Sequence, residues 1–232
     1  MSVLYRVTKN KEYLDIALNA QEFIEENLCN GLKLYTSFRN GKHSDKGFLD
    51  DYAFYIASLI ELYNSTLDKE FLKKAESFLN ESIKQFWDLE NGGFYLCKTE
   101  SMELFINPKE NYDGAMPSGN SVMTYNLVRL YQQTERYGEI LNKQLEYMLS
   151  QVQDYPAGHS MFLFAAILNE NPPEHITVVL KNEEDLIELP ENLPLLANIS
   201  VVNDGEEYKL INDKTTYYVC KNNICEPPKN YI

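Results

Sequence analysis

Cysteine, tryptophan and histidine are scarce in this sequence, which excludes several classes of site. The 232 residues include 4 cysteines, 1 tryptophan and 3 histidines. Four cysteines in a chain this long are too few for a disulfide scaffold, so we expect reduced thiols. Cys220 and Cys225 are close in sequence, but no second Cys or His pair accompanies them, and we predict no metal site. We expect no cofactor either, since we find no phosphate-binding glycine loop and no nucleophile elbow.

Positive charge and long apolar runs are also lacking. The chain has 21 basic against 35 acidic residues, a formal net charge of -14, which repels phosphate backbones and anionic lipid surfaces. We therefore predict no nucleic-acid partner and no membrane partner. No apolar run approaches the roughly 20 residues of a spanning helix, and the N-terminus lacks the long apolar core of a signal peptide. These features predict a cytoplasmic protein.

What the sequence does contain is an internal repeat. The segment 4–14 recurs at 62–72, and a shortened copy lies at 130–137. Around each copy, apolar residues recur at steps of three and four, which indicates that each copy joins the end of one helix to the start of the next. We predict about six full helices paired as hairpins, with strand-like pieces in the longer loops. Such hairpins bury their apolar faces only by stacking on neighbours.

The repeat and the tail together predict the domain organisation. The first copy lies almost at the N-terminus, so we expect the chain to start inside a repeat and to be a fragment or a truncated product. After residue 172 the sequence turns to β-branched runs, which favour strands. We predict a mainly α protein, with a partial α/α (helical-hairpin) toroid of about three hairpins at 1–171 and a small α/β C-terminal tail at 172–232.

Four motifs carry a resemblance to a known family. They are GFLDDYA at 47–53, WDLENGGFY at 87–95, DGAMPSGNS at 113–121 and YVCKNNICEPP at 218–228. In these segments the chain resembles the C-terminal half of the thioredoxin-domain-containing, spermatogenesis-associated-protein-like family. The resemblance implies a six-hairpin toroid similar to N-acylglucosamine 2-epimerases and six-hairpin glycosidases, and hence a link to carbohydrate metabolism. It implies no thioredoxin activity for this chain, because the family's redox domain lies outside these segments.

The geometry of a hairpin ring predicts where a site would lie. Every second helix runs the same way, so the long loops and the following helix starts face one end of the ring, which we call the mouth. Glycosidic bond cleavage needs two carboxylates across the bond. Asp50 and Asp51 point about 100° apart on a helix, so we predict a catalytic pair of Asp51 and Asp113. The alternatives are a helix N-cap for Asp50 and a structural hydrogen-bonding role for Asp51.

His159 is the third predicted catalytic residue, because a histidine near neutrality suits the proton transfers of sugar epimerisation. Its alternative is a satisfied structural histidine. The predicted substrate-binding residues combine helix starts with aromatic side chains that present an apolar face and a polar handle. They are Asp50, Tyr52, Trp87, Tyr95, Tyr112, Ser118 and Asn120. For Ser118 and Asn120, helix capping is the alternative.

Two hypotheses of function remain open from the sequence. The first is a carbohydrate-active domain, either isomerase-like or glycosidase-like, with a small carbohydrate as its ligand. The second is a non-catalytic binding or assembly domain, in which the same residues cap helices and order loops. An open ring edge would expose apolar helix faces, so we also expect a homodimer formed through that edge.

Overall fold

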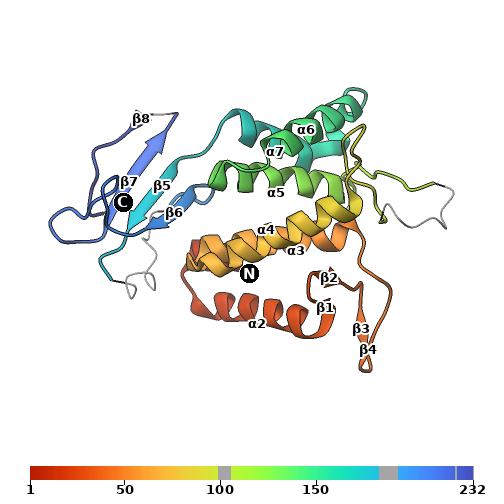
Figure 1. The fold of residues 1–232 in the computed structure, drawn as a ribbon, viewed down its shortest axis with the longest axis horizontal. Helices are drawn as coiled ribbons and strands as arrows, with labels where there is room; N and C mark the ends of the chain where they lie inside the picture. Colours follow the sequence, from red (N-terminus) through yellow and green to blue (C-terminus); the bar gives the residue numbers. More distant parts are fainter. Residues whose placement is uncertain (99–105, 183–192, 223, 232) are drawn as a thin grey trace.

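The computed structural model describes residues 1–98, 106–182, 193–222 and 224–231 (Figure 1). The helices are α1 (Ser2–Thr8), α2 (Lys11–Leu28), α3 (Leu49–Thr66), α4 (Lys69–Phe86), α5 (Gly119–Thr134), α6 (Gly138–Val152) and α7 (Ser160–Glu170), with a short 3-10 turn at Pro156–His159. The six predicted helical segments all lie within α2 to α7, and α1 is a short additional helix. The predicted mainly α fold is confirmed.

The helices form two layers of a helical-hairpin toroid. α1, α3, α5 and α7 contact one another in succession, and α2, α4 and α6 each pack on the helix that precedes them in the chain. Within this array α5 is the most enclosed helix, with every residue from Gly119 to Leu130 buried. Buried polar groups on α5 bond to neighbouring backbone, as when Asn126 Nδ2 donates to the carbonyl of Ala53 at 2.8 Å. The core therefore lies along α3 and α5.

The three copies of the sequence repeat form the same turn in space. α1, α3 and α5 each end at a left-handed residue whose N–H donates to a tyrosine carbonyl four residues back, at 2.7 Å in each turn. The left-handed residues are Lys9, Leu67 and Glu135, with φ of 57°, 56° and 57°. The accepting tyrosines are Tyr5, Tyr63 and Tyr131. These contacts make α1, α3 and α5 structurally equivalent at their C-terminal ends.

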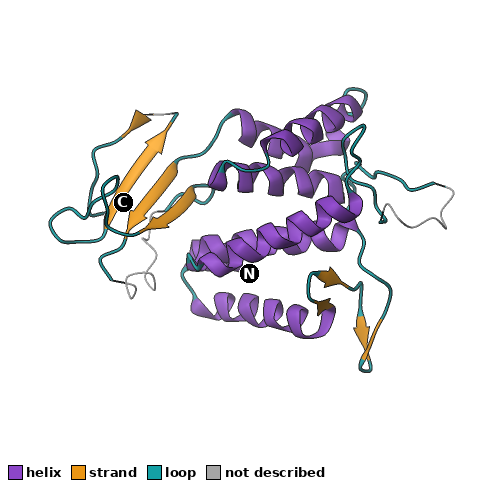
Figure 2. Cartoon of the chain, in the orientation of Figure 1, coloured by secondary structure: helices purple, strands orange, loops and turns teal. Residues whose placement is uncertain are grey.

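A separate sheet lies beyond the C-terminal ends of α3 and α5 (Figure 2). It contains β5 (His175–Val179), β6 (Asn198–Val202), β7 (Thr216–Lys221) and β8 (Ile224–Cys225), in the order β6-β5-β7-β8. β5 pairs with β6 in parallel and with β7 antiparallel. The three predicted strand runs of the tail coincide with β5, β6 and β7, and the regular elements of the tail's described residues are strands.

Hydrogen bonds join this sheet to the helices. The buried Arg129 of α5 donates to the carbonyls of Leu196 at 2.6 Å and Ala197 at 3.3 Å. Tyr63 Oη donates to the carbonyl of Ile199 at 2.6 Å. The sheet therefore sits at the end of the array opposite the starts of α3 and α5.

The expectation of reduced thiols is wrong for two of the four cysteines. Cys220 and Cys225 are not reduced thiols but form a disulfide, because the β7–β8 pairing places them directly opposite each other. Sequence spacing alone does not reveal such a cross-strand register. Tyr131 belongs to the repeat, but it is 38% exposed rather than part of the core. Cys29 and Cys97 are free, as expected.

The loops between hairpins contain little regular structure. β1 (Cys29–Asn30) pairs with β2 (Lys33–Leu34), and β3 (Phe38–Arg39) pairs with β4 (Lys42–His43), both antiparallel. The strand-like piece at 92–97 forms a single bridge between Phe94 and Trp87. Among the described residues, none of the helices is long and apolar enough to cross a membrane.

Candidate functional site

The starts of α3, α5 and α7 are tied together at one end of the array. The Leu49 N–H of α3 donates to the carbonyl of Leu96, at 3.0 Å. The neighbouring Phe94 N–H donates to Asn120 Oδ1 of α5 at 2.8 Å. The Met161 N–H of α7 donates to Asp113 Oδ2 at 2.7 Å. The loops and helix starts that the repeat places at the mouth thus meet there.

A cavity of about 420 Å³ opens beside α3 at the mouth. Its mouth end is polar and contains Asp50, Asp51 and Thr36, whereas its floor between α2 and α3 is largely apolar. The complete lining is Ile24, Leu28, Leu34, Tyr35, Thr36, Asp50, Asp51, Phe54, Tyr55, Ser58 and Met116. The cavity therefore combines two carboxylates, two tyrosines and apolar surface, which is the composition of many small-molecule sites.

Asp50 lines the cavity and has a carboxylate oxygen without a hydrogen-bond partner. Its Oδ1 is buried and accepts no hydrogen bond of ordinary geometry among the described residues. Burial raises the pKa of Asp50, the negative charges of Glu110 and Asp51 raise it further, and the nearby N–H of Gly119 offsets part of the rise. Asp50 is not the N-cap of α3, because Phe48 holds that position. A carboxyl with a raised pKa at the edge of a cavity is suited to donate a proton.

Asp51 and Tyr52 contribute mainly to the local fold. Asp51 Oδ2 accepts a hydrogen bond from the Phe48 N–H at 2.8 Å, which closes the first turn of α3, although Asp51 also borders the cavity. Tyr52 is fully buried, and its hydroxyl accepts from the Leu34 N–H at 3.1 Å. Tyr52 therefore presents no surface to a ligand, and its predicted substrate contact gains no support.

Asp113 has both oxygens committed to helix starts. Oδ1 accepts from the Ser118 N–H at 2.9 Å, and Oδ2 accepts from the Met161 N–H at 2.7 Å. Asp113 does not line the cavity that Asp51 borders. Ser118 is the N-cap of α5, which agrees with the helix-capping alternative, and its side chain accepts a hydrogen bond from the Ser121 N–H. The catalytic pair of Asp51 and Asp113 stays a prediction, and these bonds favour structural roles for both.

His159 is buried with both ring nitrogens occupied. Nδ1 lies 2.9 Å from the carbonyl of Tyr155, and Nε2 lies 3.3 Å from Asn111 Oδ1. Tyr112 is 59% exposed and stacks on Tyr155. These contacts are those of a structural histidine whose two ring nitrogens both have hydrogen-bond partners. The catalytic role of His159 stays a prediction.

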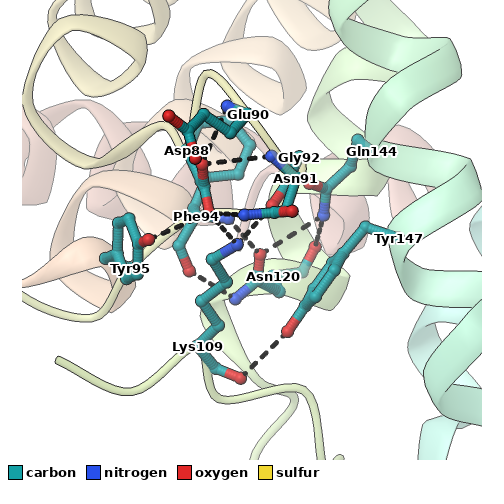
Figure 3. Close-up of polar contacts among 10 residues, drawn as sticks. All are labelled: Asp88, Glu90, Asn91, Gly92, Phe94, Tyr95, Lys109, Asn120, Gln144 and Tyr147. Carbon is teal, nitrogen blue, oxygen red and sulfur yellow. Dashed lines mark hydrogen bonds and ion pairs between the residues drawn. The ribbon is translucent and has the colours of Figure 1, made fainter. Parts of the chain in front are cut away.

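Polar contacts around Lys109 and Asn120 fasten the α4–α5 loop, as Figure 3 shows. Lys109 Nζ contacts Asp88 Oδ2 and the carbonyl of Gly92, each at 2.6 Å. It also lies over the rings of Tyr95 and Tyr147, at 4.8 and 4.9 Å from their centroids. Because these four groups already surround the Lys109 ammonium, the role of the Tyr95 ring here is to pack against Lys109.

The acidic partner of Lys109 has a strongly perturbed pKa. Burial by itself would raise the pKa of Asp88, but hydrogen bonds from Lys109, the Asn91 backbone and Tyr95 outweigh it and hold the pKa well below the usual range. Asp88 is thus an anion at neutral pH, and its contacts order the loop. Trp87 beside it is buried against Phe94 and is not part of the cavity lining.

Asn120 is fully buried, and its amide bonds to the loop backbone. Oδ1 accepts from the Phe94 N–H and Nδ2 donates to the Phe94 carbonyl, both at 2.8 Å (Figure 3). Nδ2 also donates to the carbonyl of Glu110, at 2.8 Å. With its amide used in this way, Asn120 positions the segment that carries Glu110. The structure favours this positioning role over the predicted bond to a sugar hydroxyl.

Sequence reasoning missed Glu110 and Met116. Glu110 is exposed and close enough to Asp50 for its charge to raise the Asp50 pKa, and Met116 lines the cavity. Neither residue belongs to a periodic pattern, although Met116 lies within the 113–121 motif. Asn120 holds the backbone of Glu110 through the hydrogen bond to its carbonyl. Among the described residues, none of the His, Cys, Asp and Glu side chains form a group of three that could hold a metal ion.

Comparisons with known proteins agree with this architecture. No family model matches the chain. An uncharacterised protein of Caenorhabditis elegans, B0495.5, is 27% identical over 98% of this chain and 34% of its own length. Spermatogenesis-associated protein 20 of Homo sapiens is 25% identical over 78% of this chain and 26% of its own length. The mouse protein of that name is 38% identical over 38% of this chain. The chain thus spans about a third or less of these relatives.

A solved structure supports the fold independently. Cellobiose 2-epimerase from Bacillus thermoamylovorans B4167 superposes with a TM-score of 0.51 at 21% identity, over 62% of this chain and 40% of that chain. At this identity the likeness establishes the fold alone. The resemblance that the motifs carry is confirmed: the chain is a sequence relative of spermatogenesis-associated protein 20, and its helices form part of an α/α toroid of the kind found in that epimerase.

Proposed function

We propose that the mouth of the helical array is a carbohydrate-binding site in which Asp50 is the proton donor. The observation that carries this proposal is that Asp50 lines the mouth cavity while its buried Oδ1 accepts no hydrogen bond of ordinary geometry among the described residues. A protonated carboxyl in that position can donate to a sugar oxygen, and the raised pKa favours the protonated form. The epimerase fold supports a sugar as the class of ligand.

The chemistry requires a second group that accepts a proton or stabilises positive charge. Glu110 is our candidate for this role, since it is exposed and acidic and its negative charge acts on Asp50, although, like Asp113, it is not part of the cavity lining. Asp50 and Glu110 thus replace Asp51 and Asp113 as our preferred pair, for either an isomerase-like or a glycosidase-like reaction.

A non-catalytic role is the second candidate, and a specific observation favours it. Asp51, Asp113 and Asn120 all bond to backbone groups that close helix turns or hold loops. If Asp50 also serves only the fold, the mouth is an ordered surface rather than a reaction site. Sugar binding and proton transfer are therefore tested separately below.

The first experiment measures binding to a panel of monosaccharides and to cellobiose by NMR chemical-shift perturbation. We expect the backbone amides of Asp50, Gly119 and Met116 to shift with at least one sugar, and Asp50→Ala to weaken that binding by about tenfold through the lost hydrogen bond to the sugar. The matched control is Asp15→Ala on the exposed side of α2. Sugar-induced shifts that are the same in Asp50→Ala as in the unaltered protein would remove Asp50 from the site.

The second experiment separates catalysis from binding. Any sugar that binds is incubated with the protein in D₂O, and deuterium incorporation and product formation are followed by NMR. Turnover that falls in Asp50→Asn and in Glu110→Gln supports the acid and base pair. Binding without turnover in the unaltered protein favours the non-catalytic candidate.

A further inference from the structure

Two exposed tyrosines at the mouth form a pair with nearly parallel rings. Tyr112 and Tyr155 are 59% and 56% exposed, although each is a large aromatic side chain. Their ring planes lie within 14° of each other and their centroids are 6.4 Å apart, at the wide end of the range for offset rings. We call this pair the tyrosine platform. Adjacent exposed aromatic rings, unlike a single one, are a feature of binding surfaces.

Backbone hydrogen bonds join the two segments that carry the platform. The Asp113 N–H, next to Tyr112, donates to the carbonyl of Gly158 at 2.7 Å. The Gly158 N–H in turn donates to the carbonyl of Tyr155 at 3.1 Å, and His159 Nδ1 lies 2.9 Å from that same carbonyl. The two rings are therefore placed before a ligand arrives, which lowers the entropy cost of binding.

The backbone of Gly158 supports both rings. A methyl group at position 158 would lie only 2.5 Å from Cδ1 of Tyr155 and 2.8 Å from Cε2 of Tyr112. Both rings thus pack directly on a residue without a side chain. Because Gly158 itself is buried, the open side of the platform is the side that faces solvent.

The polar groups beside the platform are uncharged amides. Asn111 Nδ2 donates to Gln151 Oε1 at 3.3 Å, and Asn111 Oδ1 lies 3.3 Å from a ring nitrogen of His159, the residue that follows Gly158. Amides both donate to and accept from hydroxyl groups, and tyrosine rings offer an apolar face for a sugar ring. The net charge of -14 and the exposed Asp154 oppose an anionic ligand. This combination favours a neutral sugar.

A single turn separates the platform from the mouth cavity. The Tyr112 ring also lies against Gly114, where a methyl group would be 3.2 Å from Cε1 of the ring. The Gly114 N–H donates to the carbonyl of Met116 at 3.1 Å, and Met116 lines the mouth cavity. A ligand of several linked rings can therefore contact the cavity and the platform together.

We propose that the tyrosine platform is a second sugar subsite, so that the ligand of the mouth is a neutral oligosaccharide rather than a monosaccharide. One ring of the ligand occupies the cavity beside Asp50. A further ring stacks on Tyr112 and Tyr155, and the exposed Gln151 amide bonds to its hydroxyls. The placing of the first ring rests on the proposed function, whereas the platform has its own evidence in the contacts of Gly158.

The test follows both subsites separately by NMR titration of the full chain with glucose and with its β-1,4-linked dimer and tetramer. The backbone amide of Asp50 reports on the cavity, and that of Gly158 reports on the platform. We expect glucose to shift the Asp50 signal only. The tetramer should shift both signals and bind about tenfold more tightly than glucose, because the second ring adds a stacking contact.

Three variants assign the gain to the platform. We expect Tyr112→Ala and Tyr155→Ala each to weaken tetramer binding by about tenfold and to leave glucose binding unchanged. Tyr155→Phe keeps the ring and should retain most of the tetramer affinity, which a loss through misfolding would not reproduce. Tyr231→Ala is the control, since Tyr231 is 77% exposed in the C-terminal tail.

The two reporters distinguish failure of this inference from failure of the proposed function. A Gly158 signal that no probe shifts, or tetramer binding that neither alanine variant weakens, would overturn the platform, whatever the Asp50 signal does. A tetramer that shifts Gly158 but not Asp50, with binding lost in both alanine variants, would support the platform as a sugar site and contradict the proposed role of Asp50.

Discussion

Asp50 lies so close to Gly119 that a methyl group on Gly119 would overlap Asp50 Oδ1. The same methyl group would lie 3.0 Å from Cγ and Cδ2 of Leu49. The first turn of α3 therefore packs directly on the backbone at the start of α5. This contact requires a glycine at position 119 and sets the direction of the Asp50 carboxyl.

Gly119→Ala tests that contact. Alanine normally favours a helix over glycine, but here the overlap forces α3 and α5 apart, and we expect a loss of about 1–3 kcal/mol in the free energy of unfolding. Urea denaturation provides the measurement. Gly205→Ala is the control, since a methyl group there meets its nearest neighbour at an ordinary 3.8 Å. A stabilising Gly119→Ala would show that the two helix starts are free to adjust.

The raised pKa of Asp50 predicts a pH dependence of stability. The folded state holds the Asp50 proton more tightly than the unfolded state, whose pKa is near the ordinary 3.8. Stability from this group is therefore complete at low pH and is lost as the pH rises from about that value through the folded pKa. We expect Asp50→Asn to be more stabilising, relative to the unaltered protein, at pH 7 than at pH 3.5. Urea denaturation midpoints of both proteins at the two pH values measure this effect. A stability change on mutation that is the same at pH 7 and at pH 3.5 would contradict the burial of the Asp50 charge.

Lys109→Met tests the lysine site of the α4–α5 loop. The side chains of Lys109 and Asp88 are only 13% and 7% exposed, so removing the cation leaves a buried anion, and we expect a loss of about 3 kcal/mol at pH 7. The control is Lys73→Met, which breaks an exposed pair with Glu70 and should change little.

The lysine site also has a defined pH dependence, opposite in sign to that of Asp50. The folded-state pKa of Asp88 is lowered, so its contribution is present above its unfolded pKa near 3.8 and is lost as the pH falls toward the folded pKa. The stability gap between the unaltered protein and Lys109→Met should therefore narrow below about that value. Denaturation curves of both proteins from pH 7 to pH 2.5 measure this difference in stability. A difference that does not change with pH would exclude coupling between the charges of Lys109 and Asp88.

Arg129→Met tests the junction between the helices and the sheet. Methionine keeps much of the volume but leaves the carbonyls of Leu196 and Ala197 without their donor, and we expect a loss of about 2 kcal/mol or more. Hydrogen exchange should show faster exchange in β5 and β6, and little change in α4. Arg39→Met is the control, because Arg39 is exposed and forms none of the ion pairs found among the described residues. Equal losses of stability in the two variants would contradict the role of Arg129 at the junction between the helices and the sheet.

Residues 1–171 show how far local sequence determines this fold. The apolar steps of three and four placed α2 to α7, because amphipathic helices must bury one face whatever their partners are. The copies at 4–14 and 62–72 predicted the hairpin turns, since equivalent positions of the two copies form the same left-handed turn. The β-branched runs at 176–180 and 199–202 gave the strands of the tail for a similar local reason.

The candidate site was determined only by the tertiary structure. Asp50, Asp51, Asp113 and Asn120 all stand near helix starts, where capping and catalysis call for the same residue types, so the sequence cannot separate the two roles. Contacts across 48 or 26 residues favour structural roles, by giving Asp113 the N–H of Met161 and Asn120 the backbone of Phe94. Asp50 is left with a buried oxygen that has no hydrogen-bond partner among the described residues, and the charge of Glu110 acts on it. The sequence thus determined the helical repeat through local periodicity, while the roles of the polar side chains followed from which distant backbone groups the packing brought within hydrogen-bonding distance.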